Sequence, residues 1–420
     1  MSIAPAAGAQ TKLTFQDALN RAVTVNNSVE RAHADVNAAN ELRKSYLSAV
    51  LPQLNLQGAT IRNSQQVSFG SGSDARLILP GSDWNYRFVL SQPVFAGLRE
   101  QRAYKQAKLG VSNAEQSVFG TEDAVLLRVA SNYLAVVAAD AQIEVENQNI
   151  ALAQKRRDQS NAFFKAGEVT RVDVLRAETA IRSEQRLLAS EQQAREEAVS
   201  RLRADLNLPP GPVDVVRPES PFPALPDEST LVTRAQDRRP DVVQAANNVK
   251  VAHLEVQKQK GFWFPVVTFD AGYINQKSAF PSSSYGYGAL RFTVPIWDSG
   301  ETRANVAQAR EHEIQANLYL QDAKTAARED VHTAMTALQE AETSLQLAND
   351  QLTAAQAEYQ QNFELYRAQE TTSLDLAASE ASLADARRAV VAETLNRAIA
   401  QLRVWYAAGA LKDALGVTQS

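Results

Sequence analysis

The sequence of 420 residues contains no cysteine. Neither a disulfide framework nor a thiolate metal site can therefore form. An excess of positive charge is also absent, because 43 Lys and Arg residues stand against 48 Asp and Glu residues and the isoelectric point is about 5.6. Without a basic surface, we expect no nucleic-acid partner.

Long apolar segments are missing as well. No run approaches the ~18 apolar residues of a membrane-spanning helix, so we expect no such helix. The opening "MSIAPAAGAQ" has neither a basic region nor an apolar core. We therefore expect any secretory signal of the natural gene to have been removed or replaced.

Motifs of catalysis and nucleotide binding are not found. There is no Walker A or dinucleotide fingerprint, and the histidines lack HExxH spacing. We expect these scattered histidines at the surface or between helices. The sequence predicts no enzyme activity, no cofactor and no resident metal. The four histidines are His33, His253, His312 and His332.

An internal repeat is present instead. "SQPVF" (91–95) is echoed 202 residues later by "TVPIW" (293–297), and the same offset aligns "FFKAGEVTRVDV" (163–174) with "LYRAQETTSLDL" (365–376). Upstream the offset is 213, so the first half has 11 extra residues between its two prolines. We infer a tandem duplication of about 200 residues, far longer than a solenoid repeat.

The duplication predicts the domain organisation. Residues 13–205 and 229–404 are the two structural repeats, and each has a helix, a β-hairpin (53–95 and 265–297) and a long helical hairpin. The segment between them, 206–228, is proline-rich, which predicts an ordered or semi-rigid crossover. Residues 405–420 form a C-terminal segment.

Each repeat begins with a helix and continues with two strands. Thr14 and Asp17 form a capping-box pattern at the start of a helix over 14–50. Alternation predicts strands in "LNLQ" and in "WNYRFVL", where Trp84, Tyr86, Phe88 and Leu90 share one side. The expected strands are 53–62, 84–95, 265–276 and 285–297, with loops at 68–83 and 278–284.

A very long helix follows each strand pair. Residues from Arg99 to about Lys165, and from Glu301 to about Arg367, contain no proline and almost no glycine, which corresponds to ~100 Å of helix. The second helix has a heptad seam with alanine at the d positions, which predicts left-handed supercoiling. A short turn (166–170 or 368–372) and a returning helix of about 35 residues come next. The a positions are Val331, Leu338, Leu345, Leu352, Tyr359 and Tyr366.

Aromatic residues flank the four strands. They form two belts separated by one strand length, which is typical of an outer-membrane barrel, although alternation alone also fits a sandwich. Four strands cannot close a barrel, and an open sheet edge is not viable in lipid. Several chains must then share one barrel, and three chains supply twelve strands. The belt residues are Phe95, Trp263 and Trp297 on the helix side and Trp84, Tyr285 and Tyr287 at the other end.

Several motifs in this order carry a family resemblance. "RRPDVVQAANNVKVA" (238–252), the paired "QPVFAG" and "VPIWDSG", and "AGEVTRVDVL" together resemble the TolC family of outer-membrane efflux proteins over about residues 13–412. The resemblance implies a mainly α fold with a membrane β part. Three copies would form a long α-helical coiled-coil barrel in the periplasm and a shared twelve-stranded barrel in the bacterial outer membrane. The linker and C-terminal segment would form an equatorial collar.

The resemblance also implies partners and a function. The homotrimer would contact outer-membrane lipid and dock to a periplasmic adaptor (membrane fusion) protein and an inner-membrane pump of RND, ABC or MFS type. It would serve as the exit duct of tripartite efflux or type I secretion. Unlike the lipoprotein branch, this sequence has no N-terminal lipid-attachment cysteine. The alternative is a periplasmic coiled-coil adaptor or scaffold without a pore, which explains the heptads but not the strands.

The resemblance places a periplasmic gate at the helical tips. Asp375 matches the first aspartate of the family's acidic constriction, and Asp173 is the weaker candidate. Three copies would form a carboxylate ring. The second aspartate of the motif is replaced by Ala378, so we expect weaker cation binding. Alternatively, both aspartates only cap helices in S/T-x-x-D boxes.

The turns at these tips resemble the family's adaptor-docking residues. Gly167 could instead be only a helix C-cap with positive φ. Since Gln369 occupies the matching position, the second turn need not adopt that conformation. Arg239, Pro240 and Asp241 are expected to start a helix. The docking candidates are Gly167, Glu168, Thr170, Gln369, Glu370 and Thr372.

Overall fold

The computed structural model describes residues 11–70, 72, 76–218, 222–277 and 282–417. The chain divides into two compact units. One, here the helical unit, comprises Met1–His33, Ser117–Val242 and Ala323–Ser420, and the other, the strand unit, comprises Ala34–Gln116 and Val243–Asp322. Each unit takes segments from both sequence repeats, so a repeat is not a compact unit by itself.

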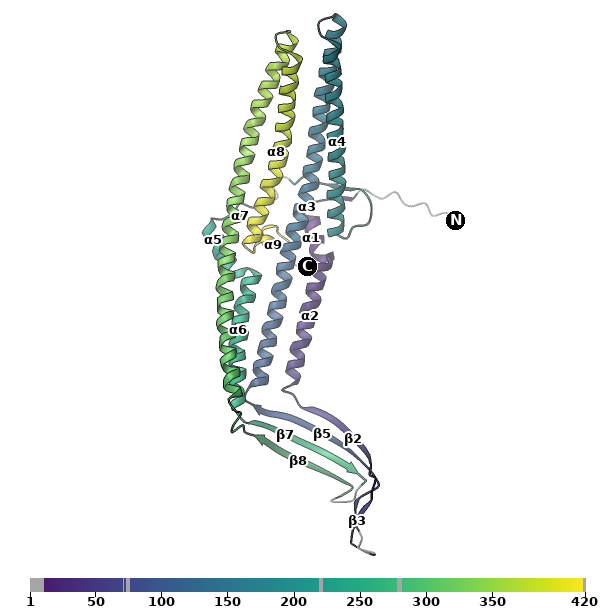
Figure 1. Ribbon diagram of the computed structural model, residues 1–420, viewed down its shortest axis with the longest axis vertical. Coiled ribbons are helices and arrows are strands. Elements are labelled where there is room, and N and C mark those ends of the chain that lie inside the picture. Colours follow the sequence, from purple (N-terminus) through teal and green to yellow (C-terminus); the bar gives the residue numbers. More distant parts are fainter. Residues whose placement is uncertain (1–10, 71, 73–75, 219–221, 278–281, 418–420) are drawn as a thin grey trace, which may run out of the picture. The chain divides into compact units, whose positions relative to one another are not determined.

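The strand unit contains one four-stranded antiparallel sheet in the order β2-β5-β7-β8 (Figure 1). Its strands are β2 (Gln53–Arg62), β5 (Ser82–Ala96), β7 (Val266–Gln276) and β8 (Ser284–Thr293). Strand β8 is shorter than the sequence prediction of 285–297, because Pro295 has no backbone N–H to donate to a ladder. Both edges, β2 and β8, are open in the single chain.

The predicted loop 68–83 is a correction. It contains a separate hairpin of β3 (Val67–Phe69) and β4 (Arg76–Leu79), and β5 already begins at Ser82. The glycine- and serine-rich composition concealed two short strands. Of the second predicted loop, 278–284, residues 278–281 lie outside the described residues, and Ser284 starts β8.

The two faces of the sheet differ in polarity. Directly paired residues share a face, and the register pairs Leu56 with Phe88 and Phe88 with Tyr273. The opposite face has Asp270, whose carboxylate accepts a hydrogen bond from Ser91 Oγ (2.7 Å) and pairs with Arg291 (3.0 Å). The apolar face comprises Leu54, Leu56, Trp84, Tyr86, Phe88, Leu90, Phe269, Tyr273, Leu290 and Phe292.

Glycine is required where the strands turn into helices. Gly97 has a φ of +65°, and a Cβ there would lie 2.1 Å from the carbonyl oxygen of Gly261. Leu98 also has positive φ, and so do Ser299 and Gly300, which lie 202 residues further on. Both copies therefore make this turn with two consecutive left-handed residues, as the duplication requires.

The first predicted helix, 14–50, is in fact two helices. Helix α1 (Phe15–Val25) ends at the extended residue Asn26, and α2 (Asn27–Ser48) follows. The Asn26 side chain donates to the Asp205 carbonyl (3.0 Å) and accepts from the Ser28 N–H (3.0 Å), which stabilises the break. As predicted, Thr14 caps α1 by accepting from the Asp17 N–H.

The second copy breaks at the equivalent position. Helices α5 (Glu228–Arg238) and α6 (Pro240–Lys260) are separated by extended Arg239, which lies 213 residues after Asn26. Proline at the first position of α6 confirms the predicted helix start. The Arg239 guanidinium pairs with Asp241 and Asp330 at 2.8 and 2.7 Å. A short 3₁₀ helix, η2 (Gly261–Trp263), then leads to β7.

The long helices follow the predictions closely. They are α3 (Arg99–Ala166), α4 (Arg171–Asp205), α7 (Glu301–Arg367) and α8 (Ser373–Ala407), and they form two helical hairpins (Figure 1). None of the predicted seam positions of α7 is exposed. Small residues allow close approach, as where Ala355 packs with Leu383 and Ala386.

One helix differs from the expectation about apolar windows. Helix α3 contains an 18-residue window of mean hydropathy 1.4 with few charges, of which 44% is buried inside the protein. The window passes a test of length and composition only, and a helix packed in a protein core passes the same test. The apolar side chains of α3 include Val129 and Val136, which are buried in the helical unit.

The linker and the C-terminal segment are ordered parts of the helical unit. Strand β6 (Val213–Val215) pairs in parallel with β1 (Thr11–Leu13), and the Tyr133 hydroxyl bridges the Leu13 and Val216 carbonyls at 2.8 and 2.7 Å. At the C-terminus, α8 runs to Ala407 and is followed by α9 (Leu411–Ala414).

Candidate functional site

The two helical tips are built by the same turn. At the end of α3 the N–H groups of Gly167 and Glu168 donate to the Phe164 and Phe163 carbonyls at 3.0 and 2.9 Å. The end of α7 repeats both bonds 202 residues later, at Gln369 and Glu370. These are Schellman motifs, which need a left-handed residue at the first position after the helix cap.

Gln369 corrects one expectation. Its φ is +62°, against +79° for Gly167, so the second turn does adopt the left-handed conformation without glycine. A side chain in this region carries a conformational cost that glycine avoids. The Gln369 amide also donates to the Glu168 carboxylate at 2.5 Å, a contact that glycine could not make.

Capping boxes start both returning helices. In each, the aspartate accepts from the N–H and the hydroxyl of the cap threonine, Thr170 for Asp173 and Thr372 for Asp375. The predicted caps are confirmed. Capping does not exclude a further role, because a carboxylate has two oxygens that accept several hydrogen bonds.

The environments of the two aspartates differ. Asp173 also accepts from Ser373 Oγ of the other hairpin (2.5 Å), and its side chain is only 15% exposed. Asp375 is exposed and contacts only its own turn, including Thr371 Oγ1 at 3.1 Å. Only Asp375 is thus free to face another molecule.

Both carboxylates are held in the charged form. The hydrogen bond from Ser373, with those from Thr170, lowers the pKa of Asp173. Hydrogen bonds from Thr372 and Thr371 lower the pKa of Asp375. Donors to a carboxylate favour its ionised state. Each tip therefore presents a fixed negative charge at neutral pH.

Exposed apolar side chains at the tips went unnoticed in the sequence. Val172 and Leu374 occupy equivalent positions, two residues after the cap threonines, and are 51% and 63% exposed. Leu175 and Phe164 are exposed nearby. The six docking candidates are exposed too, except for the contact between Glu168 and Gln369. The signal was the repeated pattern T-x-[VL]-D, in which a hydrophobic residue shares the exposed first turn.

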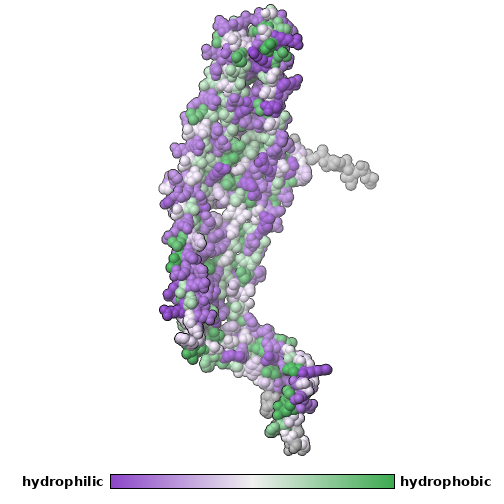
Figure 2. Space-filling view, in the orientation of Figure 1, coloured by the Kyte–Doolittle hydropathy of each residue, from purple (hydrophilic) through white to green (hydrophobic). Residues whose placement is uncertain are grey.

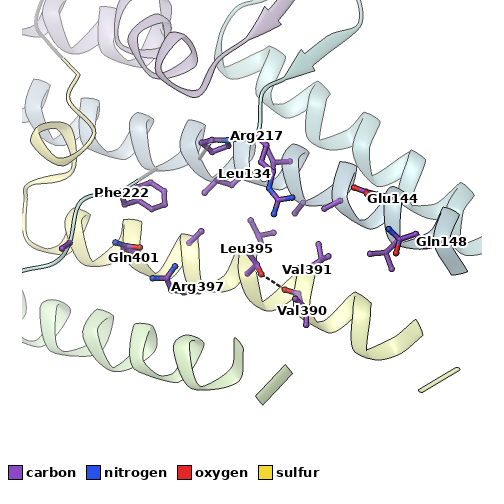
Figure 3. A pocket seen from close by; sticks show the side chains of 18 residues that line it. Leu134, Glu144, Gln148, Arg217, Phe222, Val390, Val391, Leu395, Arg397 and Gln401 are labelled. Atoms are coloured by element: carbon purple, nitrogen blue, oxygen red, sulfur yellow. Dashed lines mark hydrogen bonds between the residues drawn. The ribbon is translucent and has the colours of Figure 1, made fainter. Parts of the chain in front are cut away.

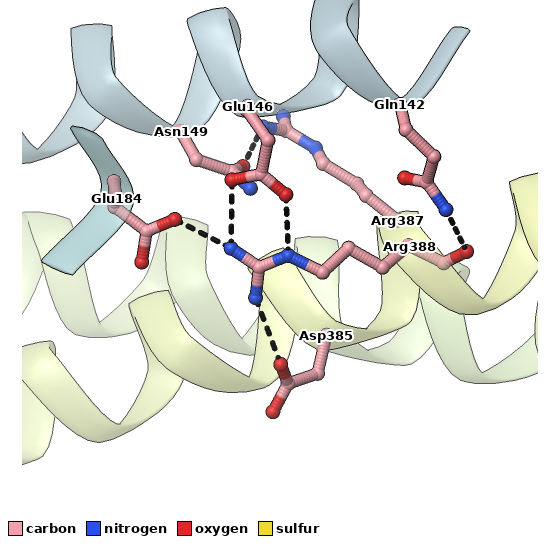
Figure 4. Close-up of polar contacts among 7 residues, drawn as sticks. All are labelled: Gln142, Glu146, Asn149, Glu184, Asp385, Arg387 and Arg388. Atoms are coloured by element: carbon pink, nitrogen blue, oxygen red, sulfur yellow. Dashed lines mark hydrogen bonds and ion pairs between the residues drawn. The ribbon is translucent and has the colours of Figure 1, made fainter. Parts of the chain in front are cut away.

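A buried ion cluster joins three helices below the tips (Figure 4). Arg388 of α8 makes two bonds to Glu146 of α3 (2.6 and 2.9 Å) and one each to Glu184 of α4 (2.5 Å) and Asp385 (3.0 Å). The Glu146 side chain is only 2% exposed. Its partners come from distant parts of the sequence, so no local motif indicated it.

A second buried pair lies nearer the tips. Arg156 of α3 contacts Glu380 of α8 at 2.6 Å, and both side chains are nearly buried. Burial raises the pKa of Glu380, and the positive charge of Arg156 opposes that rise. Ser160 and Tyr366 make a further buried contact at 3.3 Å. The two helical hairpins are thus joined by polar contacts at several levels.

A cavity of about 720 Å³ lies between α3, α8 and the linker (Figure 3). Its walls are mainly apolar, with Leu134, Phe222 and Leu395 among them, and Arg217 points into it. It is open to solvent on the single chain. No sequence motif predicted it, because three separate segments line it.

The predicted membrane-interface aromatics divide into two groups. Trp263 and Trp297 are 51% and 85% exposed, and Trp84 lies on the apolar face of the sheet. Tyr285 and Tyr287 share the polar face with Asp270, so for them the lipid assignment is revised. The single-sequence pattern placed them by depth but could not give their face. Phe95 pairs with Val267 and contacts Phe264 edge to face.

The histidines lie apart from one another. His253 contacts Glu313 (2.8 Å), His332 contacts Glu228 (2.9 Å), and His312 contacts Gln315 (3.2 Å). Within the part of the chain that the structure describes, no three acidic or histidine side chains are grouped as a metal site requires.

Comparison with protein families gives one match over both repeats. The model described as outer membrane efflux protein matches residues 8–208 and 231–410. The pyoverdine export outer membrane protein OpmQ of Pseudomonas aeruginosa is 25% identical over 389 residues, which are 89% of this chain and 81% of that protein. The outer membrane efflux protein BepC of Brucella suis is 22% identical over 78% of this chain and 73% of its own length.

Solved structures share the fold. The outer-membrane protein CusC superposes with a TM-score of 0.81 at 16% identity, over 97% of this chain and 95% of that one. The outer-membrane channel OprN gives 0.79 at 17% identity, over 94% and 90%. The open state of the MtrE channel of Neisseria gonorrhoeae gives 0.78 at 19% identity, over 94% and 89%.

Proposed function

Because the chain belongs to the outer membrane efflux protein family, we propose that its four strands join those of two further copies in one twelve-stranded barrel. The protein is an outer-membrane channel with a periplasmic helical part, the exit duct of an efflux system. The family associates with adaptors and inner-membrane pumps and forms trimers. The pump here is of RND, ABC or MFS type.

The observation that carries the barrel is the two-faced open sheet. Leu56, Phe88 and Tyr273 lie on one face, while Ser91, Asp270 and Arg291 are linked on the other. Apolar side chains toward lipid and polar ones toward a lumen are the pattern of a membrane barrel. Hydrophobic side chains are visible over the strand region in Figure 2. The open edges need partners, since unpaired backbone is costly in lipid.

At the other end, the tips serve as gate and docking surface. Exposed, ionised Asp375 supplies a carboxylate ring in the trimer, while Asp173 holds the two hairpins together through Ser373. The exposed turn residues and the apolar Val172 and Leu374 form the adaptor-docking surface. Trp84, Phe95, Trp263 and Trp297 contact the membrane interface.

Single-channel conductance in planar bilayers tests the gate. We compare the wild type with Asp375→Asn, which removes the charge but keeps an oxygen that can cap the helix. We expect cation-selective currents that divalent ions block, and at least a tenfold weaker block in the variant, because a ring of three charges is lost.

Glu358→Gln, an exposed acid on α7 away from the tip, is the matched control and should behave as the wild type. Unchanged divalent block in Asp375→Asn would leave that residue as a cap only. A folded protein that stays monodisperse without detergent and never inserts would instead support the scaffold alternative.

A further inference from the structure

The β3–β4 hairpin is an apolar projection that the second copy lacks. The sequence between β2 and β5 is longer than that between β7 and β8, and the added residues form this hairpin. Its root is fixed, because Asn63 donates from its backbone to the Gly81 carbonyl (3.0 Å) and from its side chain to the Pro80 carbonyl (2.7 Å). The hairpin is therefore a rigid continuation of β2 and β5.

The hairpin lies at the end of the sheet remote from the helices. Strands β2 and β5 meet there in the pair Arg62 and Ser82, whereas their other ends lead to α2 and α3. Figure 1 shows β3 beyond the ends of the four long strands. On the proposed function, on which this inference rests, this is the outer rim of the barrel.

Its side chains are unusually apolar for an exposed hairpin. Phe69 is 74% exposed and Ile78 60%, and Ile78 is the extra residue of a bulge between the pairs Val67–Leu79 and Ser68–Leu77. Successive strand residues point to opposite faces, so the run from Leu77 to Leu79 makes both faces apolar. Patches of this kind mark contact surfaces.

Lipid cannot cover both faces of such a hairpin. The sheet itself has one apolar and one polar face, as lipid on one side requires, but the hairpin does not follow that rule. The sequence from 63 to 82 has one acidic and one basic residue, without the Lys and Arg cluster that binds anionic headgroups. The composition favours protein as the covering surface.

We propose that the β3–β4 hairpins of neighbouring copies pack against one another at the outer rim of the trimer. The hairpin continues β2, an edge strand whose open side must be covered by another copy, so the same neighbour lies beside the hairpin. Three copies bring three such projections to one rim. Phe69 and Ile78 are the contact residues.

The absence of cysteine makes a direct test possible. Phe69→Cys and Ile78→Cys each introduce a single thiol into the trimer, which is then oxidised in detergent and examined on non-reducing gels. The matched control is Ser283→Cys, which lies at the same end of the sheet in the short turn of the second copy. A disulfide forms only when the two Cα atoms approach within about 7 Å.

We expect covalent dimers from Phe69→Cys or Ile78→Cys, with one copy of each trimer left unlinked, and none from Ser283→Cys. If neither hairpin variant forms dimers while both thiols react with a lipid-soluble maleimide, the hairpin is a lipid contact and the proposal is wrong. Free reaction with a water-soluble maleimide also overturns it.

The wild-type trimer and its conductance are measured in the same preparation. A conducting trimer whose hairpin cysteines do not link overturns the rim contact and leaves the channel function standing. A chain that forms no trimer and no pore overturns both.

Discussion

A buried aspartate gives the residue scale its clearest consequence. Asp123 on α3 is 8% exposed, and its carboxylate accepts from the Lys412 N–H at 3.2 Å, while Lys412 Nζ pairs with Glu122 at 2.6 Å. Burial raises the pKa of Asp123 to about 6, and the negative charge of Glu122 adds to the rise, whereas the Lys412 N–H lowers it. This carboxyl thus ties the C-terminal segment to α3.

The sign of the pH dependence follows from the raised pKa. The folded protein binds a proton at Asp123 below about pH 6, whereas the unfolded chain binds it only near 3.8. Ionised Asp123 therefore destabilises the fold above pH 6, and this cost disappears as the pH falls toward 4. The upper bound is about 3 kcal/mol.

We predict that Asp123→Asn raises the midpoint of thermal unfolding in detergent at pH 7.5, because the amide oxygen still accepts from Lys412. The gain should shrink to near zero at pH 4. Glu122→Gln is the control and should destabilise at pH 7.5, since it breaks an ion pair. Equal stability of Asp123→Asn and wild type at both pH values would show that the carboxylate is well solvated.

Residue-scale conformation was only partly readable from the sequence. The duplication located the left-handed turn at Gly167 and its equivalent, but Gln369 adopts it without glycine because the helix ends in the same hydrogen bonds. Asn26 breaks a helix that periodicity predicted to be continuous, since its partner is the Asp205 carbonyl. Contacts with distant backbone leave no local pattern.

At the scale of elements, the ion cluster of Arg388 determines how α3, α4 and α8 pack. Glu146 is buried, so removal of its partner leaves an uncompensated charge. The negative charge of Glu184 in the same cluster is coupled to it, and burial raises the pKa of Glu184. The cluster is therefore a specific fastener between elements.

Arg388→Met should destabilise the helical unit by about 3–5 kcal/mol, the usual cost of breaking a buried pair. The double variant Arg388→Met/Glu146→Leu should recover most of this loss, because no charge is then left buried. Denaturant unfolding followed by circular dichroism measures both. If the double variant is no more stable than Arg388→Met, the cluster's charges are hydrated and the argument fails.

Element boundaries could be predicted where the pattern was strong. The long helices and strand β2 agree with the prediction because periodicity, proline and capping act within the chain. The β3–β4 hairpin could not be predicted, since glycine and serine also suit a loop. The faces of Tyr285 and Tyr287 required the register between strands, which a single strand does not contain.

At the scale of the whole molecule, function depends on what the tips present to a partner. Val172 and Leu374 are exposed at equivalent positions of the two hairpins and contribute no core packing. Exposed apolar residues on a polar rod cost solubility unless a partner covers them. Their removal should therefore affect assembly but not folding.

The double variant Val172→Ser/Leu374→Ser should bind the cognate adaptor at least tenfold more weakly and give a matching loss of export, with unchanged trimer stability. Co-purification with the adaptor and an efflux assay in cells measure the two effects. Leu318→Ser, which is exposed on α7 in the strand unit, is the control. Wild-type adaptor binding by the double variant would move the docking surface away from the tips.

The two kinds of tip have one more consequence for assembly. Duplication gives each copy two turns of the same backbone shape, so a trimer has six nearly equivalent docking positions. Glycine occupies the left-handed position in one turn and glutamine in the other, and the glutamine reaches across to Glu168. Identical adaptor subunits arranged around the axis would therefore meet two surfaces in alternation, and successive subunits would bind with different affinities.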